Sequence, residues 1–152
     1  MCQSFKKALK FVLSMEGGYV NNPNDFGGET NFGITKKTYD AYRKANSLPP
    51  QSVKFISKNE IEEIYYKNYF LASNSHKILC PKLALVHFDT SVNMGISRAY
   101  SFLALAKNDW NKYINLRKDK YIEFAKVPSQ KIFLQGWLNR LAHLKDFINS
   151  NY

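Results

Sequence analysis

Apolar side chains recur every three or four residues through most of this chain, and this spacing limits its fold more than any other feature of the sequence. Near the start, Phe5, Leu9 and Val12 fall along one face of a helix. Runs of β-branched residues with a period of two, which would indicate strands, are scarce. The chain is therefore expected to form a mainly α fold in which helices share a core.

Residue types at the helix ends define the expected boundaries. Thr35 and Ser57 are suited to cap helices, and Glu60 completes a capping box with Ser57. Pro81 suits the first turn of a strongly apolar helix that Gly95 ends. The expected helices cover about residues 4–15, 35–45, 57–70, 81–95, 97–107, 110–125 and 131–148.

A stretch dense in glycine, asparagine and proline separates the first two helices. It covers residues 17–35, and its composition favours an irregular loop or a small β-hairpin. We expect Gly17 and Gly18 to stop the first helix by adopting left-handed backbone angles, which leaves Glu16 at the helix C-terminus. Because loops on a rigid scaffold often carry functional residues, a site is expected here.

Length and charge restrict the class of protein. The 152 residues, 45% of them hydrophobic, suffice for one core, so we expect a single domain over residues 1–152 and a monomer. A net charge of +10 attracts polyanions, either anionic cell wall or nucleic acid, although a merely solvated basic surface is the alternative. Since no zinc finger, basic zipper or RNA-binding signature is present, no nucleic-acid partner is expected.

The remaining composition argues against metals and membranes. Cys2 and Cys80 are too few for a disulfide framework and lack metal-ligand spacing, which favours free thiols and synthesis in the cytoplasm. His87 lies on an apolar helix without other ligands nearby in sequence, so we interpret it as a core histidine and expect no metal and no cofactor. Lysines interrupt the first apolar stretch, so neither a signal peptide nor membrane insertion is expected.

Carboxylates around the loop can carry acid–base chemistry. Hydrolysis of a glycosidic bond needs an acid to protonate the leaving oxygen and usually a second carboxylate. Glu16 is the candidate acid, because partial desolvation at the end of an apolar helix would favour its protonated form. Asp25 is the candidate second carboxylate, Glu29 competes for that role, and Thr30 has a hydroxyl that can orient a water. In the structural alternative, Asp25 shapes a turn, Glu29 is a solvated charge and Thr30 bonds to local backbone.

Other residues are ambiguous between a groove and the core. Tyr19 can stack on a sugar, position the candidate acid through its hydroxyl, or pack beneath the loop. Tyr66 belongs to an aromatic run at 65–70 that can line a groove, although part of that run falls on the core face. Asp89 and Asn93 lie one helical turn apart, where structural support is favoured over lining a cleft. The same ambiguity applies near the C-terminus to Trp137, Asn139 and Arg140.

Longer motifs extend across nearly the whole chain. E-G-G-Y at 16–19 is followed by N-x-P-x-D and by G-G-E-T-N-x-G-I-T, which ends at Thr35. An aromatic segment at 66–70, F-D-x-S-V-N-x-G at 88–95 and G-W-L-N-R at 136–140 continue the pattern. Together these motifs resemble glycoside hydrolase family 108.

The resemblance implies a lysozyme-like helical fold and an N-acetylmuramidase that cleaves the β-1,4 bond between N-acetylmuramic acid and N-acetylglucosamine in peptidoglycan. It places the family's catalytic glutamate on Glu16. The spacing of Glu16, Asp25 and Thr30 is also similar to that in T-even phage lysozymes, which implies Asp25 as second carboxylate and Thr30 as a helper for water. The candidate substrate-binding residues are Tyr19, Glu29, Asn31, Tyr66, Asp89 and Asn93.

One departure from the family concerns the C-terminal half. A D-G-x-x-G-P-x-T-like segment follows the V-N-x-G helix in many members and is absent here. We therefore expect residues 1–75 to form the catalytic part, and residues 76–152 to resemble a shortened predicted peptidoglycan domain that mainly completes the fold.

Two other functions compete with the muramidase. A lytic transglycosylase would leave anhydro sugar ends, and a wall-binding protein would need no catalysis at all. Members of the family serve as phage endolysins and in toxin or protein secretion, and both roles remain open. The expected action in the periplasm or cell wall calls for a holin or a dedicated export system.

Overall fold

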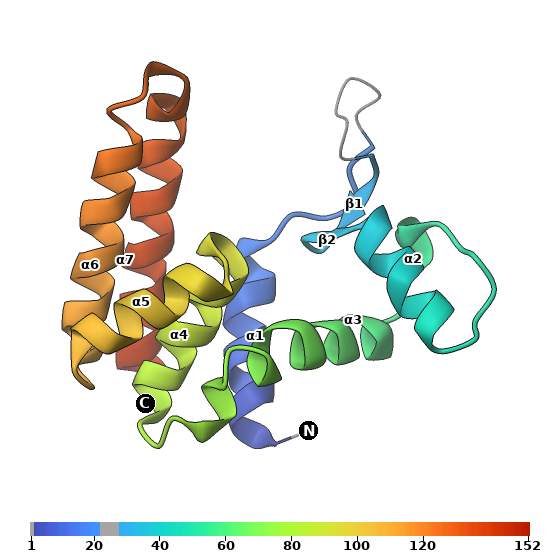
Figure 1. The fold of residues 1–152 in the computed structure, drawn as a ribbon, viewed down its shortest axis with the longest axis horizontal. Coiled ribbons are helices and arrows are strands. Elements are labelled where there is room, and N and C mark those ends of the chain that lie inside the picture. Colours follow the sequence, from blue (N-terminus) through green and yellow to red (C-terminus); the bar gives the residue numbers. More distant parts are fainter. Residues whose placement is uncertain (1, 22–27) are drawn as a thin grey trace.

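The computed structural model describes residues 2–21 and 28–152. Helices dominate, and a small antiparallel hairpin of β1 (Thr30–Asn31) and β2 (Ile34–Thr35) follows the first helix (Figure 1). The α-helices are α1 (Gln3–Met15), α2 (Lys36–Ala45), α3 (Lys58–Tyr65), α4 (Pro81–Met94), α5 (Ile96–Ala106), α6 (Trp110–Phe124) and α7 (Leu134–Asn151). The predicted mainly α fold with a hairpin after the first helix is confirmed.

The predicted helix caps are present. Thr35 accepts a hydrogen bond from the Thr38 amide at the start of α2. Ser57 and Glu60 form both bonds of the capping box at the start of α3. Side-chain oxygens at these positions satisfy amides that have no partner within the helix, which fixes where each helix begins.

Two helix boundaries differ from the prediction. α3 ends at Tyr65 and continues as a π-helical turn over Tyr66–Leu71. α7 begins at Leu134 because a 3₁₀ turn, Pro128–Phe133, precedes it. A π-helical turn holds one more residue than an α turn, and hydrophobic spacing alone does not reveal this change.

The end of α1 also forms differently. The predicted left-handed glycine cap is wrong, because Glu16 adopts extended angles (φ −89°, ψ 147°) and neither Gly17 nor Gly18 has a positive φ. The chain instead leaves the helix in an extended path towards the hairpin, where Val20 pairs with Thr30 through two backbone hydrogen bonds of 2.9 and 2.8 Å. This path, rather than a turn, follows the candidate acid.

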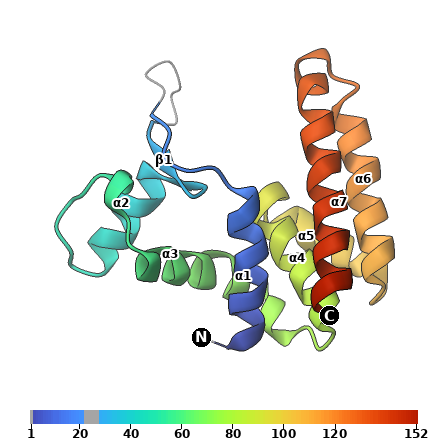
Figure 2. The ribbon, with the colours of Figure 1, turned by 180° about the vertical axis from the view of Figure 1, so that it is seen from behind.

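The arrangement of the helices places the end of α1 between two projecting parts. α6 and α7 lie side by side as a long antiparallel pair on one side of α1, and the hairpin with α2 lies on the other (Figures 1 and 2). α4 packs against α1, α5 and α6, and Phe5, Phe70 and Phe88 form an aromatic cluster in the core. Helix packing therefore fixes the position of Glu16, at the end of α1, relative to both parts.

His87 is a core residue, as predicted from its apolar surroundings. Its side chain has no exposed surface, and its two ring nitrogens lie 3.1 Å from the Tyr113 hydroxyl and 2.9 Å from the Ser73 carbonyl oxygen. Burial lowers the pKa of the imidazole, which keeps it neutral near pH 7. Among residues 2–21 and 28–152, no group of three or more His, Cys, Asp and Glu side chains is placed to hold a metal ion. No helix in these ranges is both long and apolar enough to cross a membrane.

Candidate active site

Glu16 is the carboxylate around which the candidate site is built. It follows the last residue of α1, and its side chain is 20% exposed. Packing of α1 against α4 and α7 fixes the backbone from which this side chain projects. Glu16 is thus partly buried yet open to solvent, as its role as a candidate acid requires.

An arginine from the far end of the sequence holds one oxygen of this carboxylate. Both terminal nitrogens of Arg140, on α7, donate to Oε1 of Glu16 at 3.1 Å. The two residues are 124 positions apart, so the contact exists only because α1 packs against α7. Oε2 accepts no hydrogen bond from the described residues.

Behind this ion pair lies a chain of buried charges. Asp89, on α4, has no exposed surface and accepts from Arg140 at 2.7 Å and from Arg117 of α6 at 2.8 Å. Arg117 is equally buried and donates to the Tyr121 hydroxyl, which in turn donates to Asn93. Three helices are therefore tied together directly behind the candidate acid.

Attraction between opposite charges explains how the buried aspartate and arginines of this network stay ionised without water. Burial opposes ionisation of Asp89, but the adjacent guanidinium groups outweigh it and hold the pKa of the carboxyl below its usual value. Burial likewise opposes the charge on Arg140, while Asp89 and Glu16 raise its pKa. The two arginines balance the two carboxylates while Glu16 is ionised, and a proton on Glu16 leaves the network with one positive charge.

The hairpin turn closes over the other oxygen. Phe32 and Gly33 both have positive φ, 49° and 73°, which is the geometry of a two-residue turn between paired strands. A Cβ on Gly33 would lie 2.8 Å from Oε2 of Glu16 and 2.7 Å from the Tyr65 hydroxyl. Only a residue without a side chain fits this turn against the carboxylate.

Two tyrosines form the wall beside it. The Tyr65 hydroxyl donates to the Phe32 carbonyl at 2.7 Å, and the rings of Tyr65 and Tyr69 lie 5.5 Å apart. Burial, followed by the negative charge of Glu16, raises the pKa of both phenols. Both hydroxyls therefore stay protonated at neutral pH, and that of Tyr65 acts as a hydrogen-bond donor.

The site residues predicted in the loop at 17–35 differ in where the structure places them. Asp25 lies outside the described residues, so its role stays a prediction. Thr30 is half-buried in β1 and pairs with Thr35. Asn31 is buried, and its amide donates to the carbonyls of Val53 and Lys54, so it joins the hairpin to the next turn, and its contact with substrate stays a prediction.

Tyr19 and Glu29 contact each other. The Tyr19 hydroxyl donates to Oε2 of Glu29 at 2.9 Å, and Ser52 donates to the same oxygen at 2.7 Å. The predicted contact of the Tyr19 hydroxyl with Glu16 is therefore not formed, although the Tyr19 ring is exposed enough to stack on a sugar. The bonds from Ser52 and then Tyr19 lower the pKa of Glu29.

Three further residues predicted to contact substrate lie in different environments. Tyr66 faces the core, where its ring lies 4.9 Å from that of Phe5, because one residue along a helix rotates the side chain away from the face of Tyr65. Asp89, without exposed surface, supports the site and does not reach a ligand. Asn93 lines a shallow groove of about 290 Å³ together with Arg140, at the edge of the site.

Several site residues were missed or left undecided in the sequence. The sequence pattern does not indicate a role for Arg117 or Gly33, it is ambiguous for Arg140, and it places Tyr65 and Tyr69 only within an aromatic run. An arginine among the apolar positions of α6 and another on α7 were the available signals, since buried charges need a partner. No comparable signal marked Gly33, whose role depends on contacts with distant residues.

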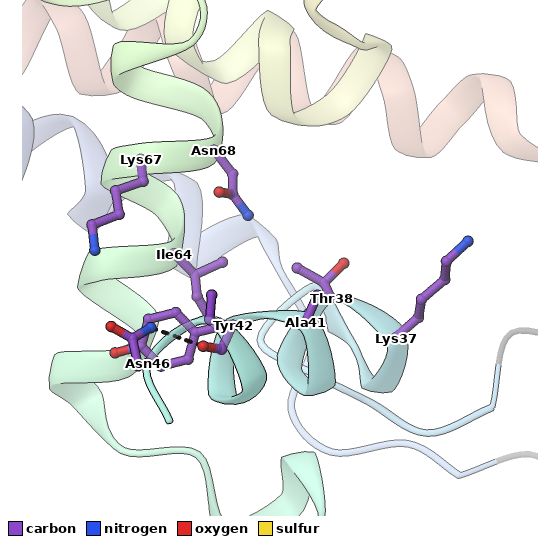
Figure 3. Close-up of a pocket in the computed structure, with 9 residues that line it drawn as sticks. Lys37, Thr38, Ala41, Tyr42, Asn46, Ile64, Lys67 and Asn68 are labelled. Carbon is purple, nitrogen blue, oxygen red and sulfur yellow. Dashed lines mark hydrogen bonds between the residues drawn. The ribbon is translucent and has the colours of Figure 1, made fainter. Parts of the chain in front are cut away.

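A larger cavity of about 640 Å³ lies between α2 and the end of α3 (Figure 3). Thr38 and Ala41 line it from α2, while Ile64 and Asn68 line it from α3 and the π-helical turn. Ile64 immediately precedes Tyr65, and Asn68 immediately precedes Tyr69, the two tyrosines that face Glu16. The cavity therefore opens on the neighbouring face of the same helix.

The fold and the site define a lysozyme-like protein, with a partly buried glutamate between a helical part and a small hairpin. The chain belongs to the glycosyl hydrolase 108 family, whose family model matches residues 9–95, and it is accordingly a glycosidase. It is similar in structure to Brucella abortus SagA, with a TM-score of 0.72 and 26% identity over 94% of this chain and 92% of that one. A search of curated proteins gave no significant match.

Proposed function

We propose that the protein hydrolyses the β-1,4 bond between N-acetylmuramic acid and N-acetylglucosamine in peptidoglycan, with Glu16 as general acid. The observation that carries this proposal is the asymmetric environment of the Glu16 carboxylate. Arg140 binds Oε1, whereas Oε2 accepts no hydrogen bond from the described residues and the side chain is 20% exposed. Oε2 is then the oxygen that delivers a proton to the leaving sugar, while the arginine keeps the carboxylate in place.

A second carboxylate is needed to stabilise the oxocarbenium-like transition state or to activate water. Glu29 is tied through one oxygen to Ser52 and Tyr19, which favours a role in fixing the hairpin. Asp25 is therefore the proposed second carboxylate, with Thr30 as the residue that orients water. This assignment rests on the similarity between the spacing of Glu16, Asp25 and Thr30 and that of the corresponding residues in T-even phage lysozymes.

The proposed path of the glycan follows the exposed faces beside α3. The cavity lined by Thr38 and Asn68 adjoins the tyrosine wall, and sugars bind well to grooves that combine aromatic rings with amides and hydroxyls. The net charge of +10 attracts the carboxylates of the wall peptides and raises the encounter rate.

The test is digestion of purified peptidoglycan by the wild type and by Glu16→Gln, Asp25→Asn and Glu29→Gln variants, with fragments identified by mass spectrometry. We expect reducing N-acetylmuramic acid ends from the wild type and from Glu29→Gln, and none from the other two. Anhydro ends, with Asp25→Asn still active, would indicate a lytic transglycosylase. No release by folded wild type from several wall types would refute catalysis and leave a wall-binding protein.

A further inference from the structure

The turn between α6 and α7 exposes apolar side chains that the fold does not use. Every residue from Lys126 to Phe133 is exposed, and we call this segment the α6–α7 tip. Ile132 is 79% exposed, and Val127 and Phe133 are about half exposed. The tip forms the far end of the long helical pair in Figures 1 and 2. Apolar groups placed together at the end of a projection indicate an interaction surface.

An aromatic cluster supports the tip from below. The ring of Trp137 lies 5.9 Å from Phe133 and 5.1 Å from Tyr121, and Phe124 lies against it at 6.0 Å. These contacts join the end of α6 to the start of α7, so the turn keeps its shape while Val127 and Ile132 stay exposed. The tip is thus a supported projection with two outermost apolar side chains.

The charge within the tip has one sign, and the nearest acidic residue along the chain before it, Glu123, pairs with Lys120 at 2.9 Å. Lys126 and Lys131 lie within it, and no Asp or Glu occurs from residue 124 to residue 145. Exposed apolar residues next to lysines, without acidic residues, are typical of segments that bind the interface of an anionic membrane. A hydrated polyanion would satisfy the lysines but would give no favourable environment to the apolar side chains.

We propose that the α6–α7 tip docks on anionic lipid bilayers, with Val127 and Ile132 inserted below the headgroups and Lys126 and Lys131 at the level of the phosphates. Binding is peripheral and reversible, and it weakens with salt because the lysine contribution is screened. The inference is independent of the glycosidase assignment, since none of these residues contacts Glu16.

The test is co-sedimentation of the full chain with phosphatidylcholine vesicles that contain or lack phosphatidylglycerol. We expect binding to the anionic vesicles only, reduced about tenfold by Val127→Ser with Ile132→Ser, and about tenfold by Lys126→Gln with Lys131→Gln. Leu79→Ser is the matched control, because Leu79 is 99% exposed, precedes α4 and lies between Lys77 and Lys82 in the sequence, away from the tip.

Three results would overturn the proposal. The first is no binding of the wild type to anionic vesicles, and the second is equal loss of binding with Leu79→Ser. The third is loss with the lysine variants but not with the serine variants, which would show attachment to a charged surface without insertion. Light scattering of the wild type and the serine variants provides a further check, since a change of oligomeric state would show that the tip binds a second copy of the chain instead.

Discussion

Replacing Asp89 with asparagine removes one charge from a buried network without changing the size of the side chain. Asp89 has no exposed surface and accepts at 2.8 Å from Arg117 and at 2.7 Å from Arg140. Removing one partner of a buried ion pair costs about 3–5 kcal/mol, because the remaining charge stays out of water without compensation. Here two arginines depend on the same carboxylate, so we expect the upper half of that range. For a chain of this length a loss of about 4–5 kcal/mol lowers the melting temperature by about 8–20 °C.

The pH dependence follows from the lowered pKa of Asp89. In the unfolded chain its pKa is about 3.9 and in the folded chain it is lower, so its stabilising contribution is complete above about pH 5. As the pH falls from about 4 through the folded pKa, the unfolded chain binds a proton first and the contribution is lost. The difference in unfolding free energy between wild type and Asp89→Asn should be constant from neutral pH to about pH 5 and shrink below about pH 4.

Urea denaturation at several pH values measures this difference, and Asp40→Asn is the control. Asp40 pairs with Lys36 at 2.7 Å, so the bond is equally short, but both side chains are exposed. An exposed pair contributes only about 0–1 kcal/mol. Equal small losses in both variants would refute the reasoning that the buried network stabilises the fold. Activity should fall about 10-fold to 100-fold in Asp89→Asn alone, because Arg140 loses the partner that positions it against Glu16.

Four further predictions concern the site. Gly33→Ala should abolish activity, because its Cβ would meet the Glu16 carboxylate. The control is Gly28→Ala, because Gly28 has a similar φ of 68° and open space around it. It should show only the backbone strain, about 1–2 kcal/mol, in a denaturation curve. Tyr65→Phe should cost about 1–2 kcal/mol of stability and lower kcat, since the Phe32 carbonyl loses its donor. Tyr69→Phe should cost less, because the Tyr69 hydroxyl donates to no carbonyl among the described residues. Ser52→Ala should lower stability by about 1 kcal/mol and leave cleavage products unchanged, and a change in the products would bring Glu29 into the mechanism. The KM for intact walls should rise with salt as the +10 charge is screened, and a KM that is insensitive to salt would remove charge attraction from the account.

Local sequence signals predicted the parts of the fold that depend on neighbouring residues. Thr35, Ser57 and Pro81 mark helix starts because capping and the fixed φ of proline act within one turn. The density of turn residues at 17–35 likewise indicated an irregular loop or a small hairpin rather than a helix. Glu16 and its place at the end of α1 followed from the same local pattern together with the family motif.

Contacts between distant segments could not be predicted in this way. The bond from Arg140 to Glu16 depends on how α7 crosses α1, and the buried position of Asn31 depends on where the turn at Val53–Phe55 folds back. Hydrophobic spacing defines which face of a helix is buried but not which helix covers it. The glycine cap at Gly17 and Gly18 was predicted from residue type, and it failed because the extended pairing of Val20 with Thr30 determines the path of the chain.

The C-terminal helices do more than complete the fold, because they supply the charges that surround the candidate acid. The family match ends at residue 95, whereas Arg117 and Arg140 lie after it, on α6 and α7. Asp89, inside the match, has no exposed surface and has these two arginines as its partners, so it would be a buried charge without compensation if they were absent. The position of the Glu16 carboxylate therefore depends on residues from both halves of the chain, and a variant such as Arg140→Met should reduce cleavage even though it leaves every residue of the matched region intact.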